Sequence, residues 1–331
     1  MTGRLLFAGG SGIVGQQAVR LFRQRHPELE ILVGGRDFDK AAAIADEVGL
    51  AEAVRIDTSR PRLGLAPNIA VSAVVMLVPD AGLHGLALAQ DSRIPYLSIG
   101  NWLIEVGAEM AHFIRRPDAS PVVLSSHWHG GPTVFLAIAS SKGLDTIHSV
   151  KVGAVVDERD PTGPTALEDM EHGAEGNVLG FADGRRVWLQ GDTARREITA
   201  IDGRTLPAQA FAPYDIVSLH AATAAKTIRF DIASGISSSR MRGGPVGTEI
   251  VLEIEGETDG RTTMRRSSLE FTKGQATLTG LSAVLSLSTV LGLERQPAAP
   301  PGLYFPEQLM DPDWFLDELR REGATIDVDL R

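Results

Sequence analysis

The glycine-rich segment near the start of the sequence combines residue types and a spacing suited to holding phosphate. An apolar run, Leu5 to Ala8, leads into the pattern G-x-G-x-x-G, and a helix-like stretch follows. There the first glycine permits a tight turn, the second lets the backbone approach a pyrophosphate, and the third lets the helix pack on the strand, while the helix N-terminus supplies amide donors. A glycine-rich turn without a ligand is the less favoured interpretation. The residues predicted to bind a dinucleotide here are Gly10, Ser11, Gly12, Ile13, Val14 and Gly15.

The end of the second predicted strand bears on the choice of dinucleotide. NAD-preferring sites usually place Asp or Glu there for the ribose hydroxyls, whereas this chain has Arg36, followed by Asp37. An arginine can pair with the 2′-phosphate of NADP(H), and Lys40 would add a second positive charge. A solvated helix lysine is an equal alternative for Lys40, and Asp37 keeps NAD(H) open. We therefore expect NADP(H) in preference to NAD(H).

Three further strand ends contribute cofactor candidates. Asp57 ends the third predicted strand and is placed to approach adenine, or else to cap the following turn. Val78 and Pro79 follow the fourth strand, and Gly100 follows the fifth. Ligands of open α/β sheets bind at the carboxyl ends of parallel strands, so these residues are predicted to lie on the nicotinamide side.

Two histidines follow the sixth predicted strand in the segment Ser126 to Pro132. His127 and His129 are candidates for proton transfer, because imidazole titrates near neutral pH. In a strand, alternation would place both on one face. A His-x-His pair with no carboxylate ligand nearby is weak support for a metal, so no metal site is predicted. Packing or a backbone hydrogen bond is the alternative for both side chains.

Substrate contacts are predicted from three residues. Asn101 and Trp102 follow the fifth strand, where an indole can stack on nicotinamide or substrate, although a large aromatic residue at a domain boundary more often packs. Arg240 lies in the Ser/Gly-rich segment Ser237 to Gly247 and is a candidate to hold a substrate carboxylate. A surface arginine is the equal alternative.

The elements that must position these residues alternate through the first 130 residues. Short apolar runs alternate with helix-like stretches, as in parallel strands joined by crossover helices, which predicts a six-stranded doubly wound Rossmann sheet. The predicted strands are Leu5 to Ala8, Glu30 to Gly34, Ala53 to Asp57, Val71 to Val78, Tyr96 to Ile99 and Val122 to Ser125. The predicted helices are Val14 to Arg25, Lys40 to Val48, Gly82 to Gln90 and Leu103 to Phe113.

After Pro132 the pattern changes to one helix, ending near Ser141, and then to longer alternating segments that indicate antiparallel strands. Two Asp-Gly pairs, at Asp183 and Asp259, separate strand-like runs and favour hairpins. These segments predict an α+β domain with a largely antiparallel sheet. Its predicted strands are Ser149 to Val156, Arg186 to Gln190, Arg195 to Ile201, Thr227 to Ala233, Glu249 to Glu255 and Thr262 to Phe271.

The intervening loop, Asp157 to Asn177, is typical of a lid or ligand-binding segment, with a surface loop as the alternative. A helical region from Gln275 to Leu293, a helix from Asp311 to Arg321 and a strand from Ala324 to Val328 complete the chain. The expected division is 1–130 for the dinucleotide domain, 131–273 for the substrate and dimerisation domain, and 274–331 for helices that return to the first domain.

Composition narrows the function classes. The 331 residues carry a formal net charge of -10, which disfavours nucleic acid and anionic membranes as partners. The sequence contains no cysteine, which excludes disulfides and thiolate chemistry. No secretion signal or membrane span is predicted, since the apolar stretch Gly274 to Leu293 is interrupted by polar residues, and a cytoplasmic location is expected by default.

These residues resemble the saccharopine dehydrogenase (reductase) family. The likeness rests on the glycine loop, on Gly35-Arg36 with Lys40, on Ile94 to Ile99, and on Pro301 to Glu307 with its Gly-x-x-x-Pro-Glu pattern. It implies that the C-terminal helices pack back onto the nucleotide domain and that the middle domain forms the platform of a homodimer. It also implies a small-molecule substrate between the domains and hydride transfer at a carbon-nitrogen bond. The middle segment has no such match, and Ser126 to Pro132 departs from the family's turn.

Other oxidoreductase chemistry is less well supported. The three tyrosines, Tyr96, Tyr214 and Tyr304, lack a lysine four residues on, which disfavours the Tyr-x-x-x-Lys class. The sequence therefore predicts an NADP(H)-dependent oxidoreductase acting on a C-N or C=O bond. A non-catalytic NAD(P)-binding sensor or scaffold is the alternative, because fold does not determine chemistry.

Overall fold

A computed structural model describes residues 3–100, 102–163 and 177–330. The chain divides into two compact units. One comprises Met1–Gly130 with Thr279–Met310, and the other comprises Gly131–Leu278 with Asp311–Arg331.

The first unit is built on a seven-stranded sheet with the order β15-β6-β5-β4-β1-β2-β3, in which every strand pair is parallel. Its strands are β1 (Arg4–Ala8), β2 (Ile31–Gly35), β3 (Ala51–Arg55), β4 (Val71–Met76), β5 (Tyr96–Ser98), β6 (Pro121–Leu124) and β15 (Gly302–Tyr304). The predicted Rossmann class is confirmed, and its six strands are all present. The seventh strand, β15, was not predicted, because three residues in a proline-rich stretch carry no periodic signal.

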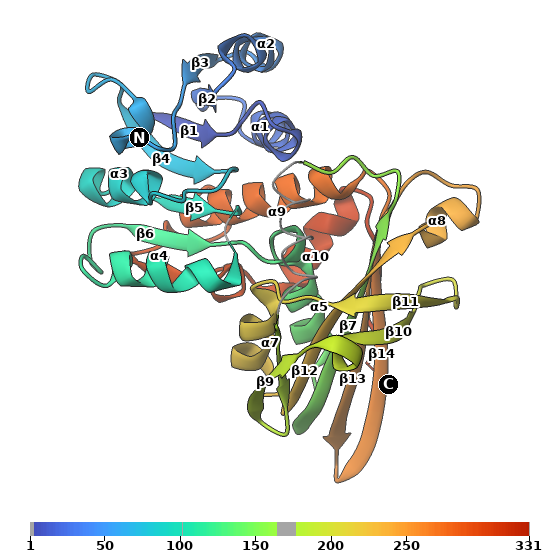
Figure 1. The fold of residues 1–331 in the computed structure, drawn as a ribbon. Coiled ribbons are helices and arrows are strands. Elements are labelled where there is room, and N and C mark those ends of the chain that lie inside the picture. Colours follow the sequence, from blue (N-terminus) through green and yellow to red (C-terminus); the bar gives the residue numbers. More distant parts are fainter. Residues whose placement is uncertain (1–2, 101, 164–176, 331) are drawn as a thin grey trace. The chain divides into compact units, whose positions relative to one another are not determined.

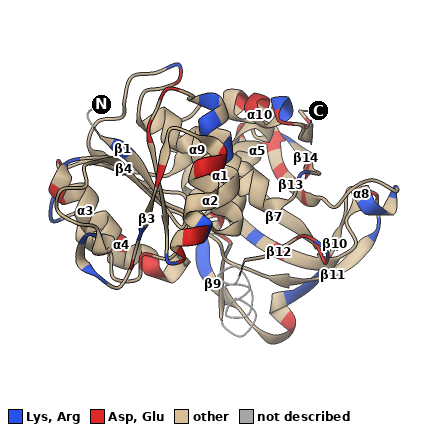
Figure 2. Ribbon diagram, turned by 90° about the horizontal axis from the view of Figure 1, so that it is seen from above, with Lys and Arg blue, Asp and Glu red and all other residues tan. Residues whose placement is uncertain are grey.

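Helices cover both faces of this sheet (Figure 1). Figure 2 shows α1, α2 and α9 on one side of the strands and α3 and α4 on the other, which is the doubly wound arrangement. The core between the sheet and the helices α1, α2 and α9 includes Phe7, Phe22, Val33, Ile44 and Leu287. The helices are α1 (Ile13–Arg25), α2 (Phe38–Val48), α3 (His84–Ser92), α4 (Val106–Phe113) and α9 (Gln275–Val290).

The last 58 residues were expected to return as one body to the first unit, and the structure divides them instead. From Thr279 onward, α9 belongs to the first unit, where Gly280 allows close packing: a Cβ there would lie 2.9 Å from the Ala18 nitrogen on α1. The helix α10 (Pro312–Arg321) and the strand β16 (Thr325–Asp327) belong to the second unit, since β16 pairs with β14.

The second unit has a nine-stranded mixed sheet whose main path is β10-β11-β12-β7-β13-β14-β16. Its pairs are antiparallel except β7 with β12, which confirms the predicted α+β class with a largely antiparallel sheet. The other strands off this path, β8 and β9, form a hairpin that joins β12. The strands are β7 (Thr146–Asp157), β8 (Val178–Ala182), β9 (Arg185–Leu189), β10 (Arg195–Thr199), β11 (Thr205–Ala210), β12 (Thr227–Gly235), β13 (Thr248–Thr258), β14 (Arg261–Phe271) and β16.

The two predicted hairpins are confirmed. Asp183 and Gly184 join β8 to β9 with φ of 49° and 73°, and Asp259 and Gly260 join β13 to β14 with φ of 51° and 70°. Positive φ at both central residues matches the twist of the strands, and Asp-Gly tolerates it. Sequence patterns missed β8, β11 and the helix α7 (Asp215–Thr223).

Helices pack on this sheet from separate parts of the chain. The helix α5 (Pro132–Ser140) contacts α7, α10 and strand β13, and Phe135 stacks on Phe315 of α10 with ring centroids 3.9 Å apart. The lid expected over Asp157 to Asn177 falls mostly outside the described residues. In the described part of the chain, every helix is too short or too polar to cross a bilayer.

Candidate functional site

The glycine loop after β1 closes through backbone contacts. The Gly10 amide donates to the carbonyls of Phe7 and Gly34, and the Gly12 amide donates to the Gly9 carbonyl. Gly9 has a φ of +87°, so it makes the tight turn that was assigned to Gly10. Gly10 is required for close packing instead, because a Cβ there would lie 2.9 Å from the Phe7 oxygen.

The loop leads into an accessible helix N-terminus. Gly12 is the N-cap of α1 and offers no capping side chain, and the first turn has no acidic residue. Ile13 is 37% exposed, Val14 is half-buried, and Gly12 is exposed. At Gly15 a Cβ would lie 2.0 Å from the Gly9 oxygen, so only glycine lets the helix start this close to the strand. The arrangement presents amide donors and a helix dipole to an anion.

On one side of this loop, the segments after β4 and β5 converge. A Cβ at Gly9 would lie 2.6 Å from Val78 Cγ1, and one at Gly100 would lie 2.8 Å from the Val78 carbonyl carbon and 2.9 Å from the Pro79 nitrogen. The residues predicted for the nicotinamide side therefore lie together with the glycine loop. Asn101 lies outside the described residues.

On the other side, Ser11 lies against the end of β2. A Cβ at Gly35 would be 2.6 Å from Ser11 Oγ, so the loops after β1 and β2 touch. Arg36 is exposed and has neither a hydrogen bond nor an ion pair to the part of the chain that the structure describes. Its guanidinium is available to a ligand.

The neighbouring carboxylate has a different task. Asp37 is the N-cap of α2, where Oδ1 accepts the Lys40 amide at 3.2 Å, and Oδ2 lies 3.7 Å from Lys40 Nζ. The acidic residue that left NAD(H) open is thus engaged by its own helix. Lys40 takes part in this ion pair, although its side chain is largely exposed.

Asp57 adopts the second of its two predicted roles. Its Oδ1 accepts from the amide of Ser59 at 3.0 Å and from the hydroxyl of Ser59 at 2.6 Å. Both hydrogen bonds lower the pKa of Asp57, and the one from the Ser59 hydroxyl has the larger effect. These contacts form a turn cap, and an adenine contact is left as an expectation.

His127 lies buried after β6, beside a residue from the C-terminal pattern. Its Nε2 is 3.8 Å from Glu307 Oε2, and its ring meets that of Phe305 edge-on, with centroids 5.3 Å apart. Burial lowers the pKa of His127 to about 3, so the imidazole is neutral at pH 7. Because β15 pairs with β6, the Pro-Glu that follows β15 comes to lie beside the segment after β6. Sequence analysis gave Glu307 no role of its own.

His129 occupies a different environment, which corrects the expectation of one shared strand face. It lies in the short 3-10 turn Trp128–Gly130 with a φ of +51°. Its Nδ1 is 3.4 Å from Thr279 Oγ1, and its ring packs on Trp128 with centroids 4.6 Å apart. Burial lowers the pKa of His129 to about 3 as well. Within the described residues, no three His, Asp or Glu side chains gather as a metal site.

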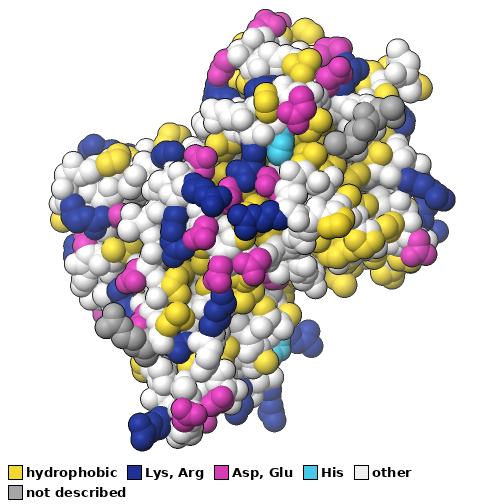
Figure 3. Space-filling view, turned by 180° about the vertical axis from the view of Figure 1, so that it is seen from behind, with side chains coloured by type: hydrophobic (Ala, Val, Ile, Leu, Met, Phe, Trp, Pro, Cys, Tyr) yellow, Lys and Arg dark blue, Asp and Glu magenta, His cyan; other side chains and the backbone are white. Residues whose placement is uncertain are grey.

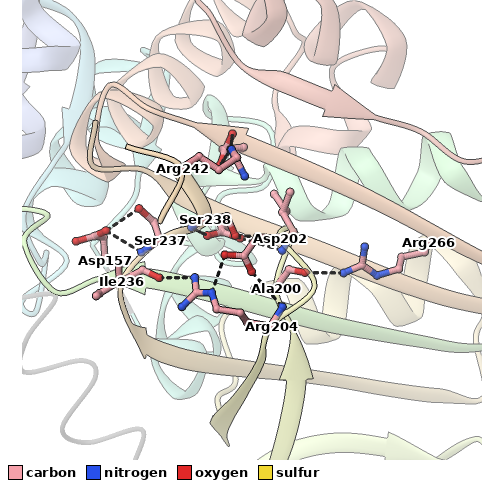
Figure 4. A network of polar contacts seen from close by, with 12 residues as sticks. Asp157, Ala200, Asp202, Arg204, Ile236, Ser237, Ser238, Arg242 and Arg266 are labelled. Atoms are coloured by element: carbon pink, nitrogen blue, oxygen red, sulfur yellow. Dashed lines mark hydrogen bonds and ion pairs between the residues drawn. The ribbon is translucent and has the colours of Figure 1, made fainter. Parts of the chain in front are cut away.

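Arg240 binds carboxylates of its own unit. Its guanidinium binds the buried carboxylate of Asp157 and lies 3.5 Å from Glu158 Oε1, so the structure shows it engaged within the second unit, and its expected role with a substrate carboxylate stays a prediction. It belongs to a polar network that ties the segment after β12 to the sheet of the second unit. Figure 4 shows Asp157 with Ser237, and Arg204 between Asp202 and Ile236.

Trp102 is half-buried, and its backbone amide donates to Glu105 Oε2 at 2.7 Å. That contact starts the 3-10 turn Leu103–Glu105 and fixes the backbone, not the indole. Lys and Arg side chains are interspersed with Asp and Glu on the face drawn in Figure 3, so the surface there is mixed in sign.

The fold belongs to the class that combines a Rossmann-type α/β unit with an α+β unit. Among solved structures it is similar to apo saccharopine dehydrogenase (L-Glu forming) from Saccharomyces cerevisiae, with 13% sequence identity, a TM-score of 0.67 and coverage of 98% of this chain and 100% of that one. The family resemblance seen in the sequence is thereby confirmed for the fold.

Two further structures cover nearly the whole chain with TM-scores below 0.5. GenD2 from gentamicin A biosynthesis, in complex with NAD, has 14% identity, a TM-score of 0.48 and coverage of 99% and 97%. Dihydrodipicolinate reductase from Paenisporosarcina sp. TG-14, with dipicolinate bound, has 12% identity, a TM-score of 0.45 and coverage of 93% and 99%. No family model and no curated protein matches the sequence.

Proposed function

We propose that this protein is an NADP(H)-dependent oxidoreductase that transfers hydride at a C-N or C=O bond of a small molecule. The observation that carries the cofactor choice is the different engagement of two neighbouring residues after β2: Asp37 caps α2, while Arg36, which follows the Gly35 that packs against Ser11, has an unengaged guanidinium. A 2′-phosphate fits such a cation, whereas ribose hydroxyls would need the carboxylate that the helix already holds.

The chain's own residues supply binding and orientation. The α1 amides and the dipole at Gly12 hold the pyrophosphate, and the loops at Val78 and Gly100 flank the nicotinamide half. The nicotinamide itself supplies or accepts the hydride. The fold shared with saccharopine dehydrogenase supports an imine or amine as the reacting group, and a carbonyl compound is the close chemical alternative.

His127 is the favoured residue for proton transfer. The imidazole of His127 is neutral at pH 7 and can accept a proton, although burial lowers its pKa to about 3 and so makes it a weak base; the Glu307 carboxylate at 3.8 Å would stabilise the imidazolium that results. His129 is the second candidate, and the Thr279 hydroxyl that lies 3.4 Å from its Nδ1 carries no charge.

The first test compares NADPH and NADH binding by fluorescence transfer from protein to nicotinamide. Arg36→Ala should weaken NADPH about 10- to 100-fold, the value of one lost charge-assisted contact, and leave NADH within about twofold. Arg115→Ala removes an exposed arginine after α4 and serves as the control. Equal affinity of the wild type for both nucleotides would contradict the cofactor assignment.

Binding without reaction has a separate meaning. If NADPH binds tightly but is never oxidised by imines, or by keto acids with amines, the protein is better described as the non-catalytic sensor or scaffold. That result would retain the Arg36 site and remove the proposed role of His127.

A further inference from the structure

A buried carboxylate lies directly behind the segment that flanks the nicotinamide half. Asp80 is 1% exposed and follows Pro79 in the chain. Its Oδ1 accepts the Gly85 amide at 3.1 Å, and its Oδ2 accepts the Leu86 amide at 2.9 Å, both in the first turn of α3. A carboxylate in this position satisfies orphan amides and complements the helix dipole.

A third donor comes from the sheet. The hydroxyl of Tyr96 on β5 donates to Asp80 Oδ2 at 3.1 Å, and both groups are buried. Burial, with the Asp80 and Glu109 carboxylates, raises the pKa of Tyr96, so the hydroxyl stays protonated and remains a donor at neutral pH. Asp80 therefore links the loop after β4 to both α3 and β5.

The Asp80 carboxylate is closely packed by its neighbours. A Cβ at Gly85 would lie 2.9 Å from Asp80 Oδ2 and 2.7 Å from Met76 Sδ. In the first turn of a helix an alanine would otherwise be favourable, because glycine lowers helix stability. Gly85 thus leaves room for Asp80.

The same loop meets the glycine loop on its other side. Val78 is two residues before Asp80, and it approaches both Gly9 and Gly100 at distances that exclude any added Cβ. The backbone at Val78 and Pro79 therefore has little freedom: the cofactor loops contact it from one side, and Asp80 holds it from the other.

We infer that Asp80 is a positioning residue for the nicotinamide half of the dinucleotide site. The inference rests on the proposed function, and it assigns to Asp80 a role in holding the Val78-Pro79 segment at the distance from Gly9 that a nicotinamide nucleotide needs. The amides of Gly85 and Leu86 and the hydroxyl of Tyr96 compensate the charge of Asp80 locally, so its role is to hold the segment in position.

Two probes separate the halves of the site. NADPH reports on the whole dinucleotide, and adenosine 2′,5′-bisphosphate reports only on the half beside Arg36. Asp80→Asn replaces one of the two acceptor oxygens by an NH2 group, so at least one α3 amide faces a donor and loses its anchoring bond. It should weaken NADPH about tenfold, equal to about 1.4 kcal/mol, and change the bisphosphate by less than about twofold.

Gly85→Ala is the second variant and keeps Asp80 itself. Its methyl group would lie against Asp80 Oδ2 and Met76 Sδ, so it should displace the carboxylate and reproduce the selective loss of NADPH. Asp157→Asn is the matched control, because it makes the same change at a buried carboxylate of the second unit. It should leave the affinities for both probes unchanged.

The outcomes are distinct. Selective loss of NADPH in both variants supports the assignment to Asp80. Equal loss of both probes means a general collapse of the site and overturns it, as does unchanged NADPH affinity in Gly85→Ala. If the wild type binds neither probe, the proposed function itself fails.

Discussion

Asp157 should make a large contribution to the change in the second unit's stability with pH. Its Oδ2 accepts from the amide and the hydroxyl of Ser237 at 2.9 and 2.6 Å, its Oδ1 accepts the Arg159 amide at 2.9 Å, and Arg240 binds it as well. Burial alone would raise the pKa of Asp157, but these bonds outweigh it and lower the pKa from 3.8 to about 2.

The magnitude follows from that shift. A difference of about 1.8 units at about 1.36 kcal/mol per unit corresponds to about 2.5 kcal/mol of stability. Since the folded pKa is lowered, this contribution is present above the unfolded value of 3.8 and is lost as the pH falls toward 2. By pH 3 the loss should be about 1 kcal/mol.

The assay is urea unfolding of the wild type and Asp157→Asn at pH 6 and pH 3, followed by circular dichroism. Other carboxylates titrate in both proteins, so the difference between them isolates Asp157. The wild type's advantage should narrow by about 1 kcal/mol at pH 3. Asp192→Asn, in an exposed pair with Arg195 at 3.5 Å, should change stability by less than about 0.5 kcal/mol. An advantage of equal size at both pH values would refute the reasoning.

Two further predictions concern residues whose roles the structure revised or sharpened. Gly15→Ala would place a Cβ 2.0 Å from the Gly9 oxygen, so NADPH affinity measured by fluorescence transfer should fall more than about tenfold; normal affinity would mean that α1 can shift without cost. Arg240→Ala should destabilise the chain by about 1.5 to 3 kcal/mol in urea unfolding, because it leaves Asp157 with one fewer charged partner. Its NADPH affinity should equal that of the wild type, and a loss of affinity would return Arg240 to the ligand site.

The parts of the fold that sequence predicted correctly are those with local signals. The strand before Gly10, the helix after it and the two Asp-Gly hairpins each depend on residues within one short window. The parallel pairing of β7 with β12 depends on contacts between segments about 80 residues apart, such as Val150 with Ile228, and alternation carries no information on strand direction. Likewise β15 becomes a strand only because β6 offers it an edge.

The candidate site divides in the same way. The glycine loop was found, because its chemistry requires glycine at fixed spacing. Glu307 could not be placed beside His127, since 180 residues separate them in the chain. The partner of Arg240 could not be predicted for a related reason: a loop arginine has the same sequence signal whether it faces a ligand or a buried carboxylate such as Asp157.

Under the proposed function, helix capping favours Arg36 over Asp37 as the residue that contacts the cofactor. An N-cap aspartate contributes about 1 kcal/mol to helix stability, and Asp37 gains this at the Lys40 amide. To bind ribose hydroxyls, Asp37 would have to leave the cap and its contact with Lys40, which would offset much of the gain. Arg36 bears no such cost, because it has no bond in the described structure to give up. Cofactor preference in this protein would then follow from where α2 begins as much as from the charge of the residue that faces the ligand.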